Sequence, residues 1–133
     1  MLNTKLIATE SQQAMALVDY CNAHLIPIIH IANEGKRLWL LDARKGIQKG
    51  FPDFLIPLVK MPYGGLFLEL KREKKSLVSQ QQWDWIARLN KLSYIASIAY
   101  GLNEAIGFID GYRKYPTNTW KWEKFLGTLH RIP

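Results

Sequence analysis

Cysteine is almost absent from this sequence of 133 residues, which contains a single one, Cys21. One thiol cannot form an internal disulfide and cannot build a cysteine-rich zinc site. Cys21 follows the apolar spacing of a helix, so we expect a buried structural thiol, since a reactive thiol needs an exposed, electropositive setting. The near absence of cysteine favours an intracellular, reducing compartment.

Long apolar runs are also missing. No run approaches the ~18–20 residues that cross a bilayer, and residues 1–13 lack the continuous apolar core of a signal peptide. The basic residues are not gathered on one helix face, as a membrane-surface helix would need. We therefore expect a cytoplasmic protein, in a bacterium or in a phage-infected host, with no membrane partner.

Acidic residues are scarce relative to basic ones. The 11 Asp and Glu residues stand against 18 Lys and Arg residues, which gives a formal net charge of +7. Such an excess favours a polyanionic partner, and nucleic acid before an anionic membrane. The hydrophobic fraction of 48% and the charged fraction of 22% are those of a globular chain, and the length suits one domain.

Hydrophobic periodicity and turn residues predict the order of elements along the chain. Helices are expected at 10–25, 80–92 and 102–112, and strands at 26–32, 54–59, 66–71 and 94–100. Between Asn33 and Gly50 the pattern is mixed, and we expect a turn, a short helix or strand, and a loop. Pro57 argues for an edge position or a bulge in its strand. This order predicts an α/β fold, with helices on both faces of a mixed sheet.

The strand expected at 66–71 ends in two ionisable residues, Glu69 and Lys71. Side chains alternate between the faces of a strand, so these two share one face. Burying either ion alone would be costly, so we expect another charged group nearby. The predicted hairpin supplies one, because it brings Asp53 close to Lys71 and one register step from Glu69.

Two carboxylates at close range repel each other unless a cation lies between them. Asp53 and Glu69, with a backbone carbonyl such as that of Leu70, would suit a hard divalent ion, Mg²⁺ or Mn²⁺. Such an ion activates a bound water and stabilises a reacting phosphate. Lys71 would orient the attacking water and offset negative charge. The alternative is a structural salt bridge at the end of a strand.

The same residues carry a family resemblance. The sequence GFPD at 50–53, followed by ELK at 69–71, resembles the PD-(D/E)xK nuclease superfamily. The segments GIQKGFPDFLIPL, YGGLFLELKR, SQQQWDWIARL and GLNEAIGFIDGY are similar to its VRR-NUC branch, the virus-type replication-repair nucleases. The resemblance spans roughly residues 10–112 and implies a restriction-endonuclease-like core of helix, three-stranded antiparallel meander, helix, strand and helix.

This resemblance also implies functions for single residues. Asp53 and Glu69 would hold the metal, Lys71 would be the catalytic lysine, and Gln82 on the following helix would point into the site. An acid of the first helix, Glu10, would complete the site as a metal ligand. Glu34 is the competing candidate for that outer acid, since it follows the first strand.

The activity implied by the resemblance is metal-dependent cleavage of DNA phosphodiester bonds. Stand-alone members of the branch are similar to Holliday-junction resolvases, so we expect an endonuclease acting on branched or structured DNA. Two symmetric cuts in a two-fold symmetric junction would favour a homodimer. The alternatives are a nicking or restriction-like nuclease on duplex DNA, and a non-catalytic DNA-binding module of a replication or repair complex.

Two basic segments and an aromatic tail extend this hypothesis. Phosphate contacts, which give affinity rather than sequence preference, are expected from Lys36, Arg37, Lys49, Arg72, Lys74 and Lys75. For the basic run that begins at Lys71, a solvated loop is the alternative. We expect residues 1–115 to form the nuclease-like domain, and residues 116–133 to pack on its core or at a dimer interface.

Overall fold

The structure is a computed structural model and describes residues 6–31 and 39–114. Its elements, in chain order, are α1 (Glu10–Ala23), β1 (Ile29–His30), α2 (Trp39–Arg44), β2 (Phe54–Ile56), β3 (Leu66–Lys71), α3 (Gln80–Lys91), β4 (Ile95–Tyr100) and α4 (Leu102–Lys114). The predicted α/β class is confirmed. No helix in the described ranges is long and apolar enough to cross a membrane.

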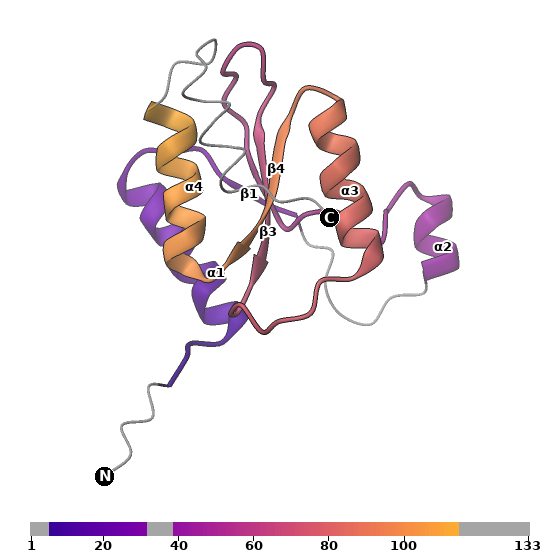
Figure 1. The fold of residues 1–133 in the computed structure, drawn as a ribbon, viewed down its shortest axis with the longest axis horizontal. Coiled ribbons are helices and arrows are strands. Elements are labelled where there is room, and N and C mark those ends of the chain that lie inside the picture. The colour runs from indigo at the N-terminus through magenta and orange to yellow at the C-terminus, as the bar shows by residue number, and fades with distance from the viewer. Residues whose placement is uncertain (1–5, 32–38, 115–133) are drawn as a thin grey trace.

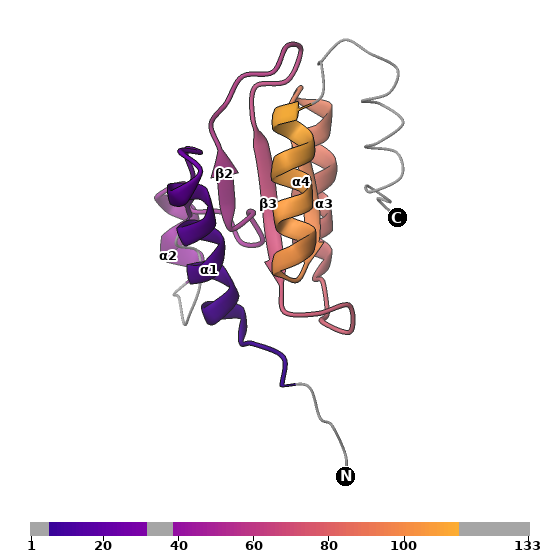
Figure 2. The ribbon, with the colours of Figure 1, turned by 90° about the vertical axis from the view of Figure 1, so that its left-hand side faces the viewer.

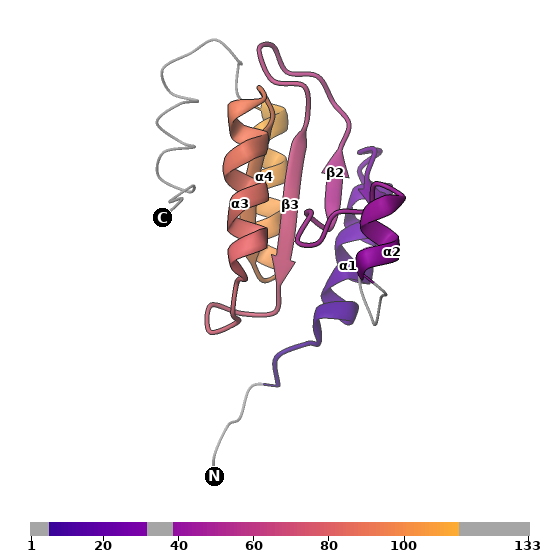
Figure 3. The same ribbon diagram turned by 90° about the vertical axis from the view of Figure 1, so that its right-hand side faces the viewer.

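The four strands form one mixed sheet in the order β1-β2-β3-β4. The pairings of β1 with β2 and of β2 with β3 are antiparallel, whereas β3 and β4 are parallel. Helix α3 is therefore the crossover between parallel strands. It covers one face of the sheet, while α1 and α4 cover the other (Figure 1). Figure 2 views the molecule from the side of α4 and α1, and Figure 3 from the side of α3.

The central strand β3 is buried on both faces, because its side chains alternate between two apolar clusters. Leu66, Leu68 and Leu70 pack with residues of α1 and α4, such as Leu17. Phe67 faces the other way, into a cluster with residues of α3. Glu69 also lies on this second face, and it and the terminal Lys71 are the charged residues of an otherwise apolar strand.

Helices α1 and α3 begin in the same way. Thr9 caps α1 and Ser79 caps α3, and each hydroxyl accepts a hydrogen bond from the backbone N–H three residues later. In turn, the side-chain Oε1 atoms of Gln12 and Gln82 accept a hydrogen bond from the backbone N–H of the cap residue, which completes a capping box at each helix. The cap fixes Gln82 in the first turn of α3, close to the end of β3.

Several element boundaries differ from the sequence prediction. The strand expected at 26–32 is reduced to β1, and the strand expected at 54–59 ends at Ile56. Pro57 follows directly and lacks the N–H that would continue the ladder. Because β2 lies between β1 and β3, the expected edge position is wrong, and Pro57 lies just beyond the strand rather than within it.

The helical boundaries are closer to expectation. The first helix ends at Ala23 rather than Leu25, whose φ of 56° is not helical. The mixed segment before Gly50 contains the short helix α2, and α4 continues two residues beyond Tyr112. The predictions for a turn at 33–35 and for the tail at 116–133 lie outside the described residues.

Candidate active site

The central feature of the site is a pair of buried carboxyl groups. Asp53, which directly precedes β2, is 6% exposed, and Glu69 of β3 is 3% exposed. Phe54 pairs with Leu68, so one step outward the register sets Asp53 opposite Glu69. We expected Asp53 to lie closer to Lys71 and one register step from Glu69. The observed pairing sets it opposite Glu69 instead, so the expectation is wrong by one step.

Backbone hydrogen bonds fix Asp53 at this position. Its Oδ2 accepts from the N–H of Leu70 at 3.0 Å, and its backbone carbonyl accepts from the N–H of Ile31 at 2.6 Å. The carboxylate thus replaces a backbone acceptor beyond the end of β2. By the same register Pro52 lies opposite Leu70, and a proline has no N–H to donate to the Leu70 carbonyl. The Pro-Asp pair therefore ends the ladder and leaves oxygen atoms at its end.

The electrostatics of the pair favour a proton between the two carboxyl groups. The pKa of Glu69 is raised from 4.5 to about 10, first by burial and then by the hydrogen bond and the charge of Asp53. The positive charge of Lys71 acts in the opposite direction, and the charge of Glu10 raises the pKa further. Without a cation, Glu69 is therefore protonated at neutral pH and hydrogen-bonded to Asp53.

Gln82 of α3 is in contact with Glu69, one member of this pair. Its Nε2 donates to Oε1 of Glu69 at 3.2 Å, while its Oε1 accepts from the N–H of Ser79 at 2.9 Å. The amide is held at both ends, so the orientation of the Glu69 carboxyl depends on the cap of α3. Lys71 is half-buried at the end of β3, on the same face as Glu69.

Glu10, the predicted outer acid, is not part of the buried pair. Glu10 is exposed in the first turn of α1 and lies near enough for its charge to act on Glu69. Within 6–31 and 39–114, no group of three or more His, Cys, Asp or Glu side chains is arranged to hold one metal ion. The carboxyl groups are thus organised as a pair, and the competing candidate Glu34 lies outside the described residues.

Behind Glu10, the buried amide of Gln13 joins three parts of the fold. Its Nε2 donates to the carbonyls of Ala8 and Arg72, both at 3.0 Å, and its Oε1 accepts from the N–H of Leu102 at 2.8 Å. This amide ties α1 to the end of β3 and to the start of α4. A sequence reveals a glutamine but not such a connection, because the partners are up to 89 residues away.

The predicted DNA-binding residues fall into three groups. Lys49, Lys74 and Lys75 are exposed. The guanidinium of Arg72 instead donates to the carbonyls of Ile7 and Ala8, at 2.7 and 3.2 Å, and so holds the segment before α1. Lys36 and Arg37 lie outside the described residues.

Gly50 brings the loop before Asp53 against the first turn of α3, a contact that the sequence analysis missed. A Cβ at Gly50 would lie 2.7 Å from the backbone carbon and the Cβ of Gln81, and φ is +84°. The adjacent Phe51 packs edge-to-face on Phe67 and Trp85. The only signal in the sequence is the glycine itself, three residues before the aspartate.

Fold and site together define a restriction-endonuclease-like α/β protein with a buried acid pair where the central strands end. Among solved structures, the chain is similar to a "VRR_NUC domain protein", with a TM-score of 0.72 and 24% sequence identity over 82% of this chain and 91% of that chain. This likeness shows the fold, and it confirms at that level the resemblance to the VRR-NUC branch. Neither a family model nor a curated protein matches the sequence.

Proposed function

We propose that this protein is a metal-dependent nuclease of the VRR-NUC branch that hydrolyses phosphodiester bonds in DNA. The observation that carries the proposal is the contact between two nearly inaccessible carboxyl groups, Asp53 and Glu69. Two such groups cost folding free energy when ionised, and a divalent cation removes that cost by replacing the shared proton. The description of the structural neighbour as a VRR_NUC domain protein supports the same function.

The oxygen atoms at the end of the β2–β3 ladder fit Mg²⁺ or Mn²⁺, which prefer carboxylate and carbonyl ligands. Asp53, Glu69 and the carbonyl of Leu70 would hold the ion. Glu10 is the candidate for a further ligand, either direct or through water. When bound, the ion would activate water for attack on phosphorus and stabilise the charge of the reacting phosphate.

The remaining residues act on the water and the carboxylates. The Lys71 ammonium, on the same face as Glu69, would orient the attacking water and offset the negative charge that develops on the phosphate. Gln82 would hold the Glu69 carboxylate in one orientation through its Nε2. Exposed lysines on the loops around the site, Lys49, Lys74 and Lys75, would contact phosphates away from the scissile bond.

For the substrate we propose branched or structured DNA, cut by a homodimer in the manner of a Holliday-junction resolvase. A nicking or restriction-like activity on ordinary duplex is the second candidate within the same chemistry. A metal-independent DNA-binding module is disfavoured by the buried acid pair, because binding DNA gives no reason to bury two carboxyl groups beside it.

Cleavage assays with Mg²⁺ and Mn²⁺ test this proposal on a panel of four-way junction, flap, splayed and linear duplex DNA. We expect Asp53→Asn and Glu69→Gln, which remove a proposed metal ligand, and Lys71→Met, which removes the group proposed to act on the attacking water, each to lower the cleavage rate by about 10²–10⁴-fold. The matched control is Lys114→Met, which removes a lysine at the far end of α4. Circular dichroism establishes that each variant is folded.

Calorimetric titration with Mn²⁺ provides a second, independent measurement. The wild type should bind the ion and Asp53→Asn should not, because one of the two carboxylates is lost. Cleavage by Lys71→Met at the wild-type rate would contradict the proposed role of the lysine. Metal binding that is unchanged in Asp53→Asn would contradict the whole assignment of the site.

A further inference from the structure

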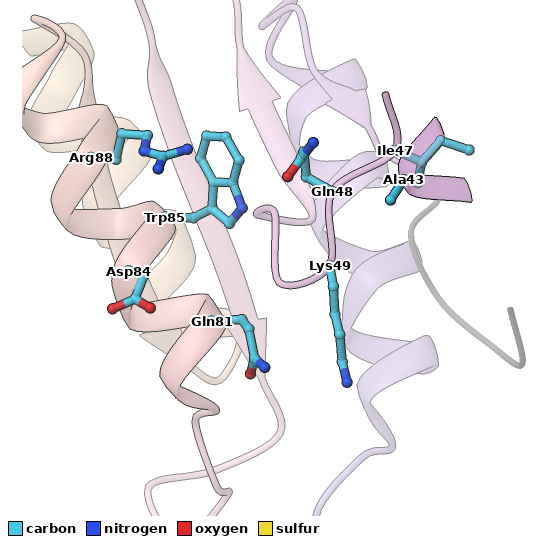
Figure 4. Close-up of a pocket in the computed structure, with 8 residues that line it drawn as sticks. All are labelled: Ala43, Ile47, Gln48, Lys49, Gln81, Asp84, Trp85 and Arg88. Atoms are coloured by element: carbon cyan, nitrogen blue, oxygen red, sulfur yellow. The ribbon is translucent and has the colours of Figure 1, made fainter. Parts of the chain in front are cut away.

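A groove of about 390 Å³ lies beside the acid pair, between α3 and the loop that follows α2. Figure 4 shows Gln81 and Trp85 on α3 facing Gln48 and Lys49 on the loop. On α3 the lining residues recur at intervals of three and four, from Gln81 to Arg88, so they form one stripe of the helix. The groove therefore runs along α3 for about 10 Å, at 1.5 Å per residue.

One end of the groove adjoins the candidate active site. Gln81 precedes Gln82, whose amide touches Glu69. On the opposite wall, Lys49 precedes Gly50, which packs against the first turn of α3. A strand whose phosphate lies at the acid pair would thus meet the groove with its next nucleotide.

The lining combines a flat stacking surface with charge and hydrogen-bonding groups. The guanidinium of Arg88 lies over the indole of Trp85, 4.7 Å from the ring centroid. Gln48 and Gln81 carry side-chain amides, the donor and acceptor chemistry that matches a base edge. Lys49 and Arg88 are cationic, against the single carboxylate of Asp84, which already accepts a hydrogen bond from Gln80 at 2.9 Å.

We propose that this groove binds one unpaired nucleotide of the DNA strand that carries the scissile phosphate. This inference rests on the proposed nuclease function and defines its substrate more closely. The base would stack on the Trp85–Arg88 surface, and its phosphate would contact Lys49. A base inside a duplex stacks between its neighbours and cannot enter a recess, whereas an unpaired base presents both its face and its edge.

The experiment compares the binding of two DNA probes in EDTA, where no cleavage occurs, by fluorescence anisotropy. One probe is a blunt duplex, and the other is the same duplex with an unpaired tail that carries 2-aminopurine. We expect the wild type to bind the tailed probe about tenfold more tightly, as one stacked base provides. Stacking should also quench the 2-aminopurine fluorescence.

The variant Arg88→Ala should lower this preference to about twofold or less while changing the affinity for blunt duplex by less than about threefold. Lys49→Ala removes a proposed phosphate contact, so it should also lower the preference but weaken the binding of both probes. Trp85→Leu should abolish the quenching, and a thermal melt establishes that it is folded. The matched control is Lys91→Ala, which removes an exposed cation from the same last turn of α3 outside the groove. It should retain the full preference.

An equal affinity for both probes in the wild type would overturn the inference, and so would a preference that survives Arg88→Ala and Trp85→Leu. The cleavage assay on the same preparation separates this outcome from a failure of the nuclease proposal. Metal-dependent cleavage without a preference for the tail contradicts the groove inference alone. A preference that depends on Arg88, without cleavage, supports the groove and contradicts the nuclease.

Discussion

At the scale of single residues, the protonation of Glu69 links stability to the candidate function. A carboxyl group that is 3% exposed and in contact with Asp53 is more stable in its neutral form, so its pKa rises to about 10. Ionising Glu69 in the folded protein therefore opposes folding unless a cation is bound. The group that would bind the metal is thus a source of instability in the metal-free protein.

This linkage predicts how stability depends on pH in EDTA. The pKa of Glu69 is about 10 in the folded protein and 4.5 for an ordinary Glu, so between these values the folded state binds one proton more than the unfolded state. The contribution of Glu69 to the free energy of unfolding is fully present below pH 4.5. It is lost as the pH rises toward 10, by at most about 1.4 kcal/mol per pH unit. Denaturant unfolding of the wild type and Glu69→Gln at pH 5, 7 and 9 measures it.

Glu69→Gln should gain stability over the wild type as the pH rises, because the amide cannot ionise. Asp19→Asn, which changes an exposed acid on α1, is the control and should follow the wild type. Adding Mg²⁺ at pH 8 should stabilise the wild type more than Glu69→Gln. A constant difference between Glu69→Gln and the wild type across this pH range would contradict the raised pKa.

The two capping boxes allow the role of Gln82 in the site to be separated from its role in the helix. Gln12 and Gln82 make the same reciprocal bonds at the starts of α1 and α3, but only Gln82 also reaches Glu69. Gln12→Ala and Gln82→Ala should each lower the free energy of unfolding by about 0.5–1 kcal/mol. Only Gln82→Ala should lower the cleavage rate, by about tenfold or more, since a hydrogen bond to a charged group such as the Glu69 carboxylate contributes about 1.5–3 kcal/mol.

Equal cleavage rates for the two variants would show that the Gln82 amide acts on the helix cap alone. Gln82→Glu then provides a further comparison, because a carboxylate restores the cap but cannot donate to Glu69. It should keep the capping bonds without recovering activity, and the carboxylate that it places beside Glu69 should oppose the stability gained from the cap.

At the scale of elements, the loop before β2 and the start of α3 depend on each other through Gly50. Gly50→Ala should lower the free energy of unfolding by about 2–4 kcal/mol, because the methyl group overlaps the first turn of α3 and φ is left-handed. The control is Gly46→Ala, which has a φ of +85° but no atom within 4 Å of its Cβ. It should cost only the strain of the backbone, about 1 kcal/mol.

Chemical denaturation of both alanine variants measures the two costs, and their difference isolates the contact with α3. Gly50→Ala should also reduce cleavage, because a shift of the loop moves Asp53 away from Glu69. Similar stability losses in the two variants would mean that the loop yields to the added methyl group without strain.

Elements with strong periodicity were predictable from the sequence, and those with weak periodicity were not. The strand 66–71 has the predicted bounds, and α3 and β4 each differ by one residue, because apolar runs between turn residues leave few alternatives. The strand expected at 26–32 is reduced to two residues, because only Phe54 and Leu55 of the short strand β2 pair with it. A sequence does not reveal where a neighbouring strand stops.

The arrangement of the candidate site was also predictable from the sequence only in part. Alternation along β3 is enough to associate Glu69 with Lys71, and a hairpin is enough to bring Asp53 near them. The exact register was missed by one step, because it depends on the geometry of the turn. The contacts of Gly50 and Gln13 were beyond prediction, since each joins elements that meet only in the folded chain.

At the scale of the whole molecule, polar and positive features gather at one end of the sheet. The parallel strands β3 and β4 end there, and α3 and α4 begin there, so both helices direct the positive ends of their dipoles toward it (Figure 1). Gln13 ties this end together by bonding to Arg72 after β3 and to Leu102 at the start of α4. A net charge of +7 adds a long-range attraction for DNA to this local field.

The position of the charges predicts which lysines determine the salt dependence of DNA binding. Lys74 and Lys75 are exposed on the loop between β3 and α3, beside the site, whereas Lys91 and Lys114 lie at the opposite ends of α3 and α4. Each phosphate contact contributes about 0.9 to the slope of log K against log salt. The double alanine variant at 74 and 75 should therefore reduce the slope by up to about 1.8, and the double variant at 91 and 114 should leave it unchanged. Anisotropy titrations at several salt concentrations measure both slopes, and equal effects of the two pairs would mean that net charge, rather than the loop beside the site, governs DNA binding.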